Sequence, residues 1–267
     1  MQKMLGYMRK AIQEYDMLSD GDSVAAGISG GKDSLVMLLG LQLLRRFIGI
    51  EYSVHALAID PVFGGKETDY TAIRAFCDKY EIPFTVIPTH IAEIVFDIRK
   101  EPNPCSLCSR MRRGALLEAT RDIGCNKLAL GHNREDVIET FFMSLLYEGR
   151  VNTFAPVTYL SRSDITVIRP LVFLPEKQAL SVARQRELPV QKANCPAAGH
   201  TKREEAKELI RHLSTIVPDV EEKMIHAIAN TEKYGLWDRM RLRYDHPLFT
   251  GPVTEKNVPA GFDIEEE

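Results

Sequence analysis

Long apolar runs and a strong excess of one charge are both absent from this chain of 267 residues. The most apolar run, residues 35–44, includes Gly40 and Gln42 and falls well short of the ~20 residues that a membrane-spanning helix needs. Charged residues occur throughout residues 1–20, so we expect no secretory signal, no membrane partner and a cytoplasmic protein. The net charge of -3 provides no global positive field, and a nucleic-acid partner would need local basic patches.

Cysteine is also scarce. The chain has five cysteines at uneven spacing, which is too few for a disulfide framework and predicts free thiols in a reducing compartment. Hydrophobic residues make up 45% of the chain and charged residues 27%, which excludes a disordered or collagen-like protein. A chain of this length can bury a sizeable core, so a globular protein is expected.

Short apolar segments alternate with helical patterns over most of the chain. We expect strands at residues 24–28, 52–59, 83–87, 127–130 and 165–169. Helices are expected at residues 4–17, 34–47, 67–80, 109–123, 135–147, 175–187, 202–213 and 219–243. This alternation is typical of an α/β fold, a parallel sheet with helices on both faces. The predicted organisation is an N-terminal helix (residues 1–20), a sheet domain (21–200) and a helical C-terminal part (201–267).

A glycine-rich turn lies between the first predicted strand and the next helix. Its residues are Ser29, Gly30, Gly31, Lys32, Asp33 and Ser34. Paired glycines let the backbone approach an anion closely, and the helix that follows offers free N–H groups and a favourable dipole. The turn is not a P-loop, because Gly27 to Lys32 is one residue short and Asp33 stands where that motif has Ser or Thr. A turn that binds nothing is the alternative.

The Ser-Gly-Gly-Lys-Asp-Ser turn resembles the pyrophosphate loop (PP-loop) of the ATP-pyrophosphatase enzymes, which adenylate a substrate and release pyrophosphate. The resemblance implies a PP-loop, or HUP-type, fold with this loop at the sheet centre, and ATP with Mg²⁺ as cofactors. It also implies that Asp60, which ends the second predicted strand, contacts the adenosine. A carboxylate that caps the turn before Pro61 is the alternative for Asp60.

A second segment supports the same resemblance. The stretch from Leu130 to Asp136 is similar to the second characteristic block of these enzymes, where a glycine and polar residues line the nucleotide site. The similarity implies nucleotide-site roles for Gly131, His132 and Asp136. Glu135 and Glu139 are expected to be solvated helix residues.

Two cysteines, Cys105 and Cys108, form a C-x-x-C motif after Pro-Asn-Pro, where a stiff loop is expected. Such a pair can hold a soft metal or a cluster, or form a redox dithiol. No second C-x-x-C follows, so the motif cannot build a closed four-thiolate zinc site alone. Cys195 precedes a proline and is expected to be an accessible loop thiol, whereas Cys77 and Cys125 are expected to be packing residues.

The C-x-x-C, the distant Cys195 and the PP-loop together resemble the tRNA 2-thiocytidine synthetase family, over about residues 20–213. In that family the three matching cysteines hold a [4Fe-4S] cluster with one open iron. The resemblance therefore implies that Cys105, Cys108 and Cys195 are cluster ligands and, with Asp33, catalytic residues. It implies an enzyme that adenylates a pyrimidine C2 oxygen, that of cytidine in the tRNA anticodon loop, and replaces it with sulfur. Unligated thiols or a redox pair are the alternative.

The implied partners are tRNA and a sulfur donor, either a cysteine desulfurase or sulfide. The sequence sets neither the modified nucleotide, the donor nor the oligomeric state, and a homodimer stays open. Residues 99–113 carry a local charge of +4 (5 minus 1, for Glu101) around the C-x-x-C, from Arg99, Lys100, Arg110, Arg112 and Arg113. A second basic cluster is formed by Arg239, Arg241 and Arg243. We predict that these patches contact RNA, and an ordinary solvated face is the alternative.

Three interpretations therefore compete. The first is an iron–sulfur, ATP-dependent tRNA thiolase. The second is a cluster-free adenylating enzyme, such as an amidating or lysine-ligating one, with structural cysteines. The third is a non-catalytic nucleotide- or zinc-binding RNA module. Iron content and ATP turnover separate the three.

Overall fold

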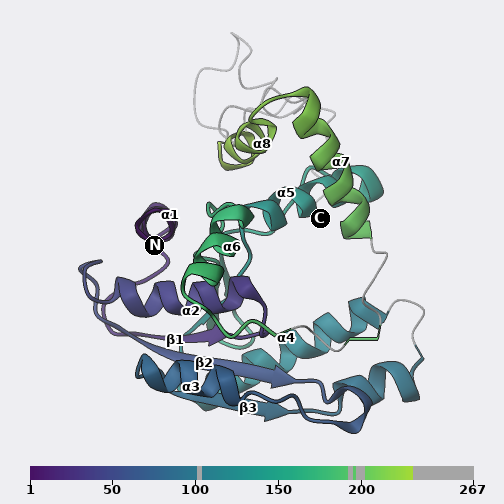
Figure 1. Cartoon of the computed structure of the whole chain (residues 1–267). Helices are drawn as coiled ribbons and strands as arrows, with labels where there is room; N and C mark the ends of the chain where they lie inside the picture. The colour runs from purple at the N-terminus through teal and green to yellow at the C-terminus, as the bar shows by residue number, and fades with distance from the viewer. Residues whose placement is uncertain (101–103, 192–194, 197–201, 231–267) are drawn as a thin grey trace, which may run out of the picture. The chain divides into compact units, whose positions relative to one another are not determined.

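The computed structural model describes residues 1–100, 104–191, 195–196 and 202–230. Six strands form one sheet in the order β3-β2-β1-β4-β6-β5 (Figure 1). Their bounds are β1 (Asp22–Gly27), β2 (Tyr52–Asp60), β3 (Phe84–Pro88), β4 (Lys127–Ala129), β5 (Val157–Leu160) and β6 (Ile165–Ile168). Neighbouring strands pair in parallel, except that β5 is antiparallel to β6. The predicted α/β fold is therefore confirmed, and β1 lies inside the sheet as expected.

Helices occur close to the predicted positions, but residues 231–243 of the helix predicted at 219–243 lie outside the described residues. They are α1 (Gln2–Glu14), α2 (Lys32–Leu44), α3 (Thr71–Lys79), α4 (Pro104–Asp122), α5 (Arg134–Met143), α6 (Glu176–Gln185), α7 (Lys202–Ile216) and α8 (Val220–Ala229), with the 3-10 turn η1 (Phe63–Gly65) and the π-helical turns η2 (Glu93–Ile98) and η3 (Ser144–Glu148). Within the described residues, none of these helices is long and apolar enough to cross a membrane. The chain forms two compact units, residues 1–225 and 226–267, of which the second is described only over residues 226–230. The three-part division expected from the sequence stays a prediction.

Helices cover both faces of the sheet. Ala25 of β1 lies in one core with Ala119 of α4. Because side chains alternate along a strand, Ala26 faces the opposite side, where α1, α2 and α6 pack on one another. A Cβ atom at Gly40 of α2 would lie only 2.1 Å from the Met8 sulfur of α1. A glycine at this position therefore lets α1 pack directly against α2.

Two elements differ from the sequence-based expectation. The sequence predicts no strand at β5. This edge strand has only four residues, and Tyr159 is 61% exposed, so the strand lacks the buried apolar run that marks the other strands. Helix α4 begins at Pro104 and not near residue 109 as expected, so Cys105 and Cys108 lie in its first two turns. Proline suits a first helical turn, since the N–H that it lacks has no partner there.

Candidate active site

The glycine-rich turn joins β1 to α2 at the carboxyl edge of the sheet. Gly30 has a φ of +80°, which favours glycine. The Ser34 hydroxyl closes the turn: it donates to the Gly31 carbonyl oxygen at 2.9 Å and accepts from the Ser29 N–H at 3.2 Å. The turn is therefore held in shape by its own side chains, and α2 begins directly after Gly31.

Two charged residues follow the glycines. The Lys32 ammonium contacts Asp33 at 2.9 Å and Glu176 of α6 at 2.8 Å. Although burial disfavours its charged form, the hydrogen bonds to Glu176 and Asp33 raise the pKa of Lys32. The amide of Asn133 donates to the other Asp33 oxygen at 3.2 Å. Lys32 is thus charged and Asp33 is oriented before any ligand binds.

The segment after β4 lies directly against this loop. A Cβ atom at Gly131 would lie 3.0 Å from the N and Cα atoms of Ser34, so any larger residue would require the start of α2 to shift. The Asn133 side chain and Asp136 form a reciprocal capping box at the start of α5. His132 lines the neighbouring cavity, and burial lowers its pKa to about 4. The sequence-predicted residues of the two motifs are therefore brought together at one edge.

Asp136 and Glu139 form ion pairs on α5 with Arg203 of α7, at 3.1 and 3.0 Å. The expectation that Glu135 and Glu139 are solvated is wrong. Their side chains are 15% and 7% exposed, burial raises both pKa values, and Glu135 accepts a hydrogen bond from the Glu176 N–H at 2.7 Å. The helical pattern of α5 alone could not show that α6 and α7 cover this face.

Asp60 ends β2 and is 1% exposed. Its carboxylate accepts hydrogen bonds from the Val62 N–H at 3.0 Å and from the N–H and hydroxyl of Thr68 at 2.7 and 3.0 Å. Both oxygens therefore hold the loop after β2, as the turn-capping alternative requires. The contact of Asp60 with adenosine stays a prediction.

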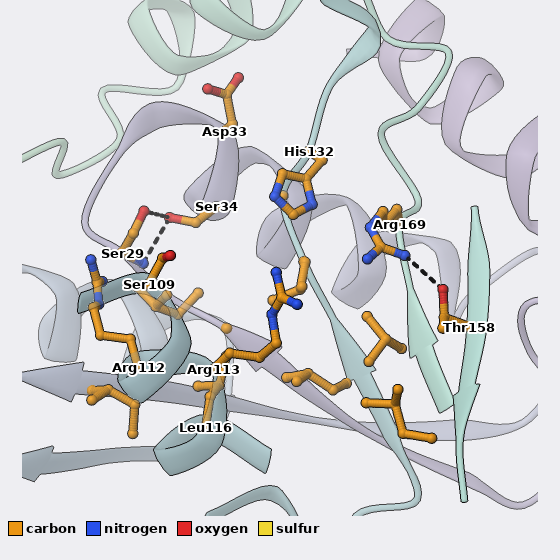
Figure 2. Close-up of a pocket in the computed structure, with 18 residues that line it drawn as sticks. Ser29, Asp33, Ser34, Ser109, Arg112, Arg113, Leu116, His132, Thr158 and Arg169 are labelled. Atoms are coloured by element: carbon orange, nitrogen blue, oxygen red, sulfur yellow. Dashed lines mark hydrogen bonds between the residues drawn. The ribbon is translucent and has the colours of Figure 1, made fainter. Parts of the chain in front are cut away.

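A cavity of about 410 Å³ opens beside the loop (Figure 2). Its polar lining comes from the loop, α4 and the ends of β4, β5 and β6: Ser29, Asp33, Ser34, Ser109, Arg112, Arg113, His132, Thr158 and Arg169. Its floor is apolar and is formed by Ile28, Ile59, Leu116, Leu128, Leu130, Leu160 and Val167. Apolar walls with a few converging polar groups are typical of a small-molecule site.

The three cysteines of the predicted ligand set are free thiols. Burial raises the pKa of Cys108, and the charges of Cys195 and Cys105 raise it further, so both thiols lie within electrostatic range of Cys108. Within the described part of the chain, no group of three or more His, Cys, Asp or Glu side chains lies in reach of one metal ion. The donor set suits iron chemically, because thiolates are soft ligands, and its assignment stays a prediction.

The remaining cysteines differ from this set. Cys77 is fully buried in α3 and Cys125 is 8% exposed before β4. Burial raises the pKa of both thiols, to about 11 for Cys77. Both environments suit the packing role expected from the sequence.

The basic patch on α4 divides between the surface and the cavity. Arg110 and Arg113 are exposed at helical spacing, and Arg112 and Arg113 line the cavity. The second cluster, at residues 239–243, lies outside the described residues. Contact of either patch with RNA stays a prediction.

Sequence reasoning missed Glu176, Arg203 and Arg169. Glu176 and Arg203 reach the site only because α6 and α7 fold over it, and no local motif marks them. Arg169 had a usable signal. It is the last residue of the strand predicted at residues 165–169, and the carboxyl ends of parallel strands are where ligands bind in such sheets.

Comparison with known proteins agrees with this geometry. The PP-loop domain family matches residues 4–221. The tRNA-cytidine(32) 2-sulfurtransferase of Citrifermentans bemidjiense is 36% identical over 86% of this chain and 91% of its own. The enzyme of the same name from Pelobacter propionicus is 35% identical over 86% of each chain.

A solved structure is also similar. It is the U34-tRNA thiolase NcsA from Methanococcus maripaludis with its [4Fe-4S] cluster, at a TM-score of 0.71 and 27% identity, over 87% of this chain and 79% of that one. The fold and the glycine-rich loop between β1 and α2 together define a protein of the PP-loop class. The chain belongs to the PP-loop family and, within it, to the tRNA-cytidine(32) 2-sulfurtransferase family, which confirms the resemblance seen in the sequence.

Proposed function

We propose that this protein is an ATP-dependent tRNA sulfurtransferase that replaces the C2 oxygen of a cytidine in the anticodon loop with sulfur. One observation carries the proposal beyond the family name. Ser109, the residue after Cys108, lines the same cavity as Ser29 and Ser34 of the PP-loop. The C-x-x-C therefore lies next to the cavity that the nucleotide loop lines, although its thiols are not part of the lining.

Adenylation explains why the enzyme would need ATP. Oxide is a poor leaving group, so the C2 oxygen first attacks the α-phosphorus of ATP; a P–O bond forms, and the bond to the β-phosphate breaks with release of pyrophosphate. The PP-loop N–H groups and Lys32 would hold the pyrophosphate, with Mg²⁺ sharing its charge near Asp33. Sulfide then forms a bond to C2, and AMP leaves with the oxygen. Positioning of the two reactants can contribute on the order of 7–11 kcal/mol.

Cys105, Cys108 and Cys195 would hold the [4Fe-4S] cluster. With three protein thiolates, the bound cluster would supply an iron with an open position for sulfide. Cys105 and Cys108 share one face of α4 at i, i+3 spacing. Cys195 comes from a distant part of the chain and lies within electrostatic range of Cys108. Neutral His132 and charged Arg112 border the space where the base would lie.

Anaerobic purification followed by two assays tests the proposal. We expect a brown, iron-containing protein that forms AMP and pyrophosphate with tRNA and yields 2-thiocytidine by nucleoside mass spectrometry. Asp33→Ala should abolish AMP formation and keep its iron, because Asp33 contacts the loop and not the thiols. Asp78→Ala, which removes an exposed carboxylate of α3, is the matched control and should behave as wild type. An iron-free protein that still forms AMP supports a cluster-free adenylating enzyme, and no ATP turnover with any tRNA contradicts both.

A further inference from the structure

The end of the cavity beside β6 carries unbalanced positive charge. Arg169 directly follows β6 and is 8% exposed, and Arg113 reaches the same cavity from α4 (Figure 2). Burial and the charge of Arg113 lower the pKa of Arg169 to about 10, with no acidic group acting against them. Within the described part of the chain, Arg113 likewise has no ion pair. Two guanidinium groups in a partly apolar cavity favour an anionic ligand.

The Nε edge of the Arg169 guanidinium has no protein partner among the described residues. Its Nη1 atom donates to the Ala155 carbonyl oxygen at 2.6 Å and to the Thr158 hydroxyl at 3.3 Å. Its Nε atom is buried without a hydrogen-bond partner, and Nη2 has none among the described residues. Nε and Nη2 together form the fork with which arginine binds two oxygens of a phosphate or carboxylate. Burial of Nε without a partner is costly unless a ligand accepts its hydrogen bond.

His132 adds a third polar group at the same place. Its Nδ1 atom is buried without a partner. The ring lies 4.8 Å from that of Phe154, and the Arg169 guanidinium lies 5.0 Å from the same Phe154 ring. Figure 2 shows Arg113 extending from α4 toward His132. With a pKa of about 4, the imidazole is neutral at pH 7 and can donate one hydrogen bond.

The position of this group separates it from the PP-loop. The loop follows β1, His132 follows β4 and Arg169 follows β6, which are successive neighbours in the sheet. At a strand spacing of about 4.8 Å, the end of β6 lies roughly 10 Å from the end of β1. A pyrophosphate held at the loop would not fill the fork of Arg169. A phosphate bound at the end of β6 would therefore be a group other than that pyrophosphate.

We propose that Arg113, Arg169 and His132 form a second anion subsite, which binds a phosphate ester in the bidentate fork of Arg169. The proposal rests on the proposed function for its two sources, the α-phosphate of the nucleotide and a phosphodiester that flanks the target nucleotide in tRNA. Either phosphate would lie next to the base during the reaction. The subsite would orient substrate relative to the loop, and the two sources predict different binding defects.

Binding to the full chain tests the subsite with two ligands. Titration with AMP reports the nucleotide phosphate, and titration with tRNA at several salt concentrations reports the phosphodiester. Arg169→Gln and Arg113→Gln should weaken one of these affinities by about 10- to 100-fold. Arg184→Gln removes an exposed positive charge of α6 and is the matched control for net charge. Arg113→Gln breaks no hydrogen bond or ion pair of the described chain. It therefore still tests the subsite if the Arg169→Gln variant fails to fold.

The AMP and tRNA affinities of the two arginine variants distinguish the possible outcomes. Weaker AMP binding with unchanged tRNA binding supports the subsite and assigns it to the nucleotide. Weaker tRNA binding, with a salt slope shallower by about 0.7–0.9, supports it and assigns it to RNA. Affinities equal to those of Arg184→Gln for both ligands overturn it. A wild-type protein that modifies no tRNA, yet binds AMP through Arg169, would leave the subsite standing while the proposed function fails.

Discussion

The backbone N–H of Gln191 donates a hydrogen bond to the carbonyl oxygen of Gly30 at 2.9 Å. The Gln191 side chain also donates to the Asp69 carbonyl oxygen at 2.6 Å. Cys195 lies only four residues further along the chain. Gln191 is therefore attached to the PP-loop, and the Cys195 thiol lies within electrostatic range of Cys108, 87 residues earlier in the chain (195 minus 108).

Gly30→Ala tests this attachment. At a φ of +80° an alanine is strained, and its Cβ would meet the Gln191 Cβ at 3.4 Å. We expect a loss of about 1–2 kcal/mol in the free energy of unfolding, a clear fall in affinity for ATP analogues and a lower iron content. Gly49→Ala is the matched control, because Gly49 has a φ of +81° and no neighbour within 4 Å. Gly49→Ala should lose similar stability in thermal denaturation and keep its affinity for ATP analogues and its iron. Equal affinity for ATP analogues in Gly30→Ala and Gly49→Ala would contradict the attachment of Gln191 to the PP-loop.

Gly131→Ala tests the contact between the two nucleotide motifs. The new Cβ would lie 3.0 Å from backbone atoms of Ser34, which cannot move without changing the start of α2. We expect strongly reduced ATP binding with the iron content retained, measured by calorimetry and metal analysis. Gly6→Ala, in the open middle of α1, should gain about 0.5–1 kcal/mol of stability and bind ATP normally. Normal ATP binding by Gly131→Ala would show that the loop tolerates displacement.

The sequence predicted what is local and missed what depends on tertiary contacts. The PP-loop, the Gly131 block and the five expected strands each carry a signal within a few residues, such as paired glycines or a short apolar run. Glu176 and Arg203 have no such signal, since helices far along the chain bring them to Lys32 and Asp136. The burial of Glu139 was mispredicted for the same reason.

His132 predicts a pH dependence of stability. Burial is the main cause that lowers its pKa from 6.5 to about 4, helped by Arg169, Arg203 and Arg113. Between these two pH values the unfolded chain binds a proton that the folded chain does not, so stability falls as the pH drops from 6.5 toward 4. His132→Asn should therefore show a smaller drop in Tm between pH 7 and pH 5 than wild type. His212→Asn, which removes an exposed imidazole of α7, controls for the loss of one histidine, and an unchanged slope in His132→Asn would contradict the assignment.

The five cysteines make the sharpest prediction, because the two interpretations of the C-x-x-C differ in the role of Cys195 and in the iron content of the wild type. If Cys105, Cys108 and Cys195 hold a cluster, Cys195→Ala should lower iron content and abolish thiolation as fully as Cys105→Ala or Cys108→Ala. ATP binding should survive in all three variants, since none of these thiols lines the cavity at the PP-loop.

Cys77→Ser and Cys125→Ser are the controls. Each should keep iron and activity and lose about 1–3 kcal/mol of stability, because a hydroxyl replaces a buried thiol. A redox pair formed by Cys105 and Cys108 predicts instead a mild Cys195→Ala phenotype and no iron in the wild type. Full iron and full thiolation in Cys195→Ala would therefore exclude the three-ligand site, whereas an iron-free Cys125→Ser protein would place the third ligand elsewhere.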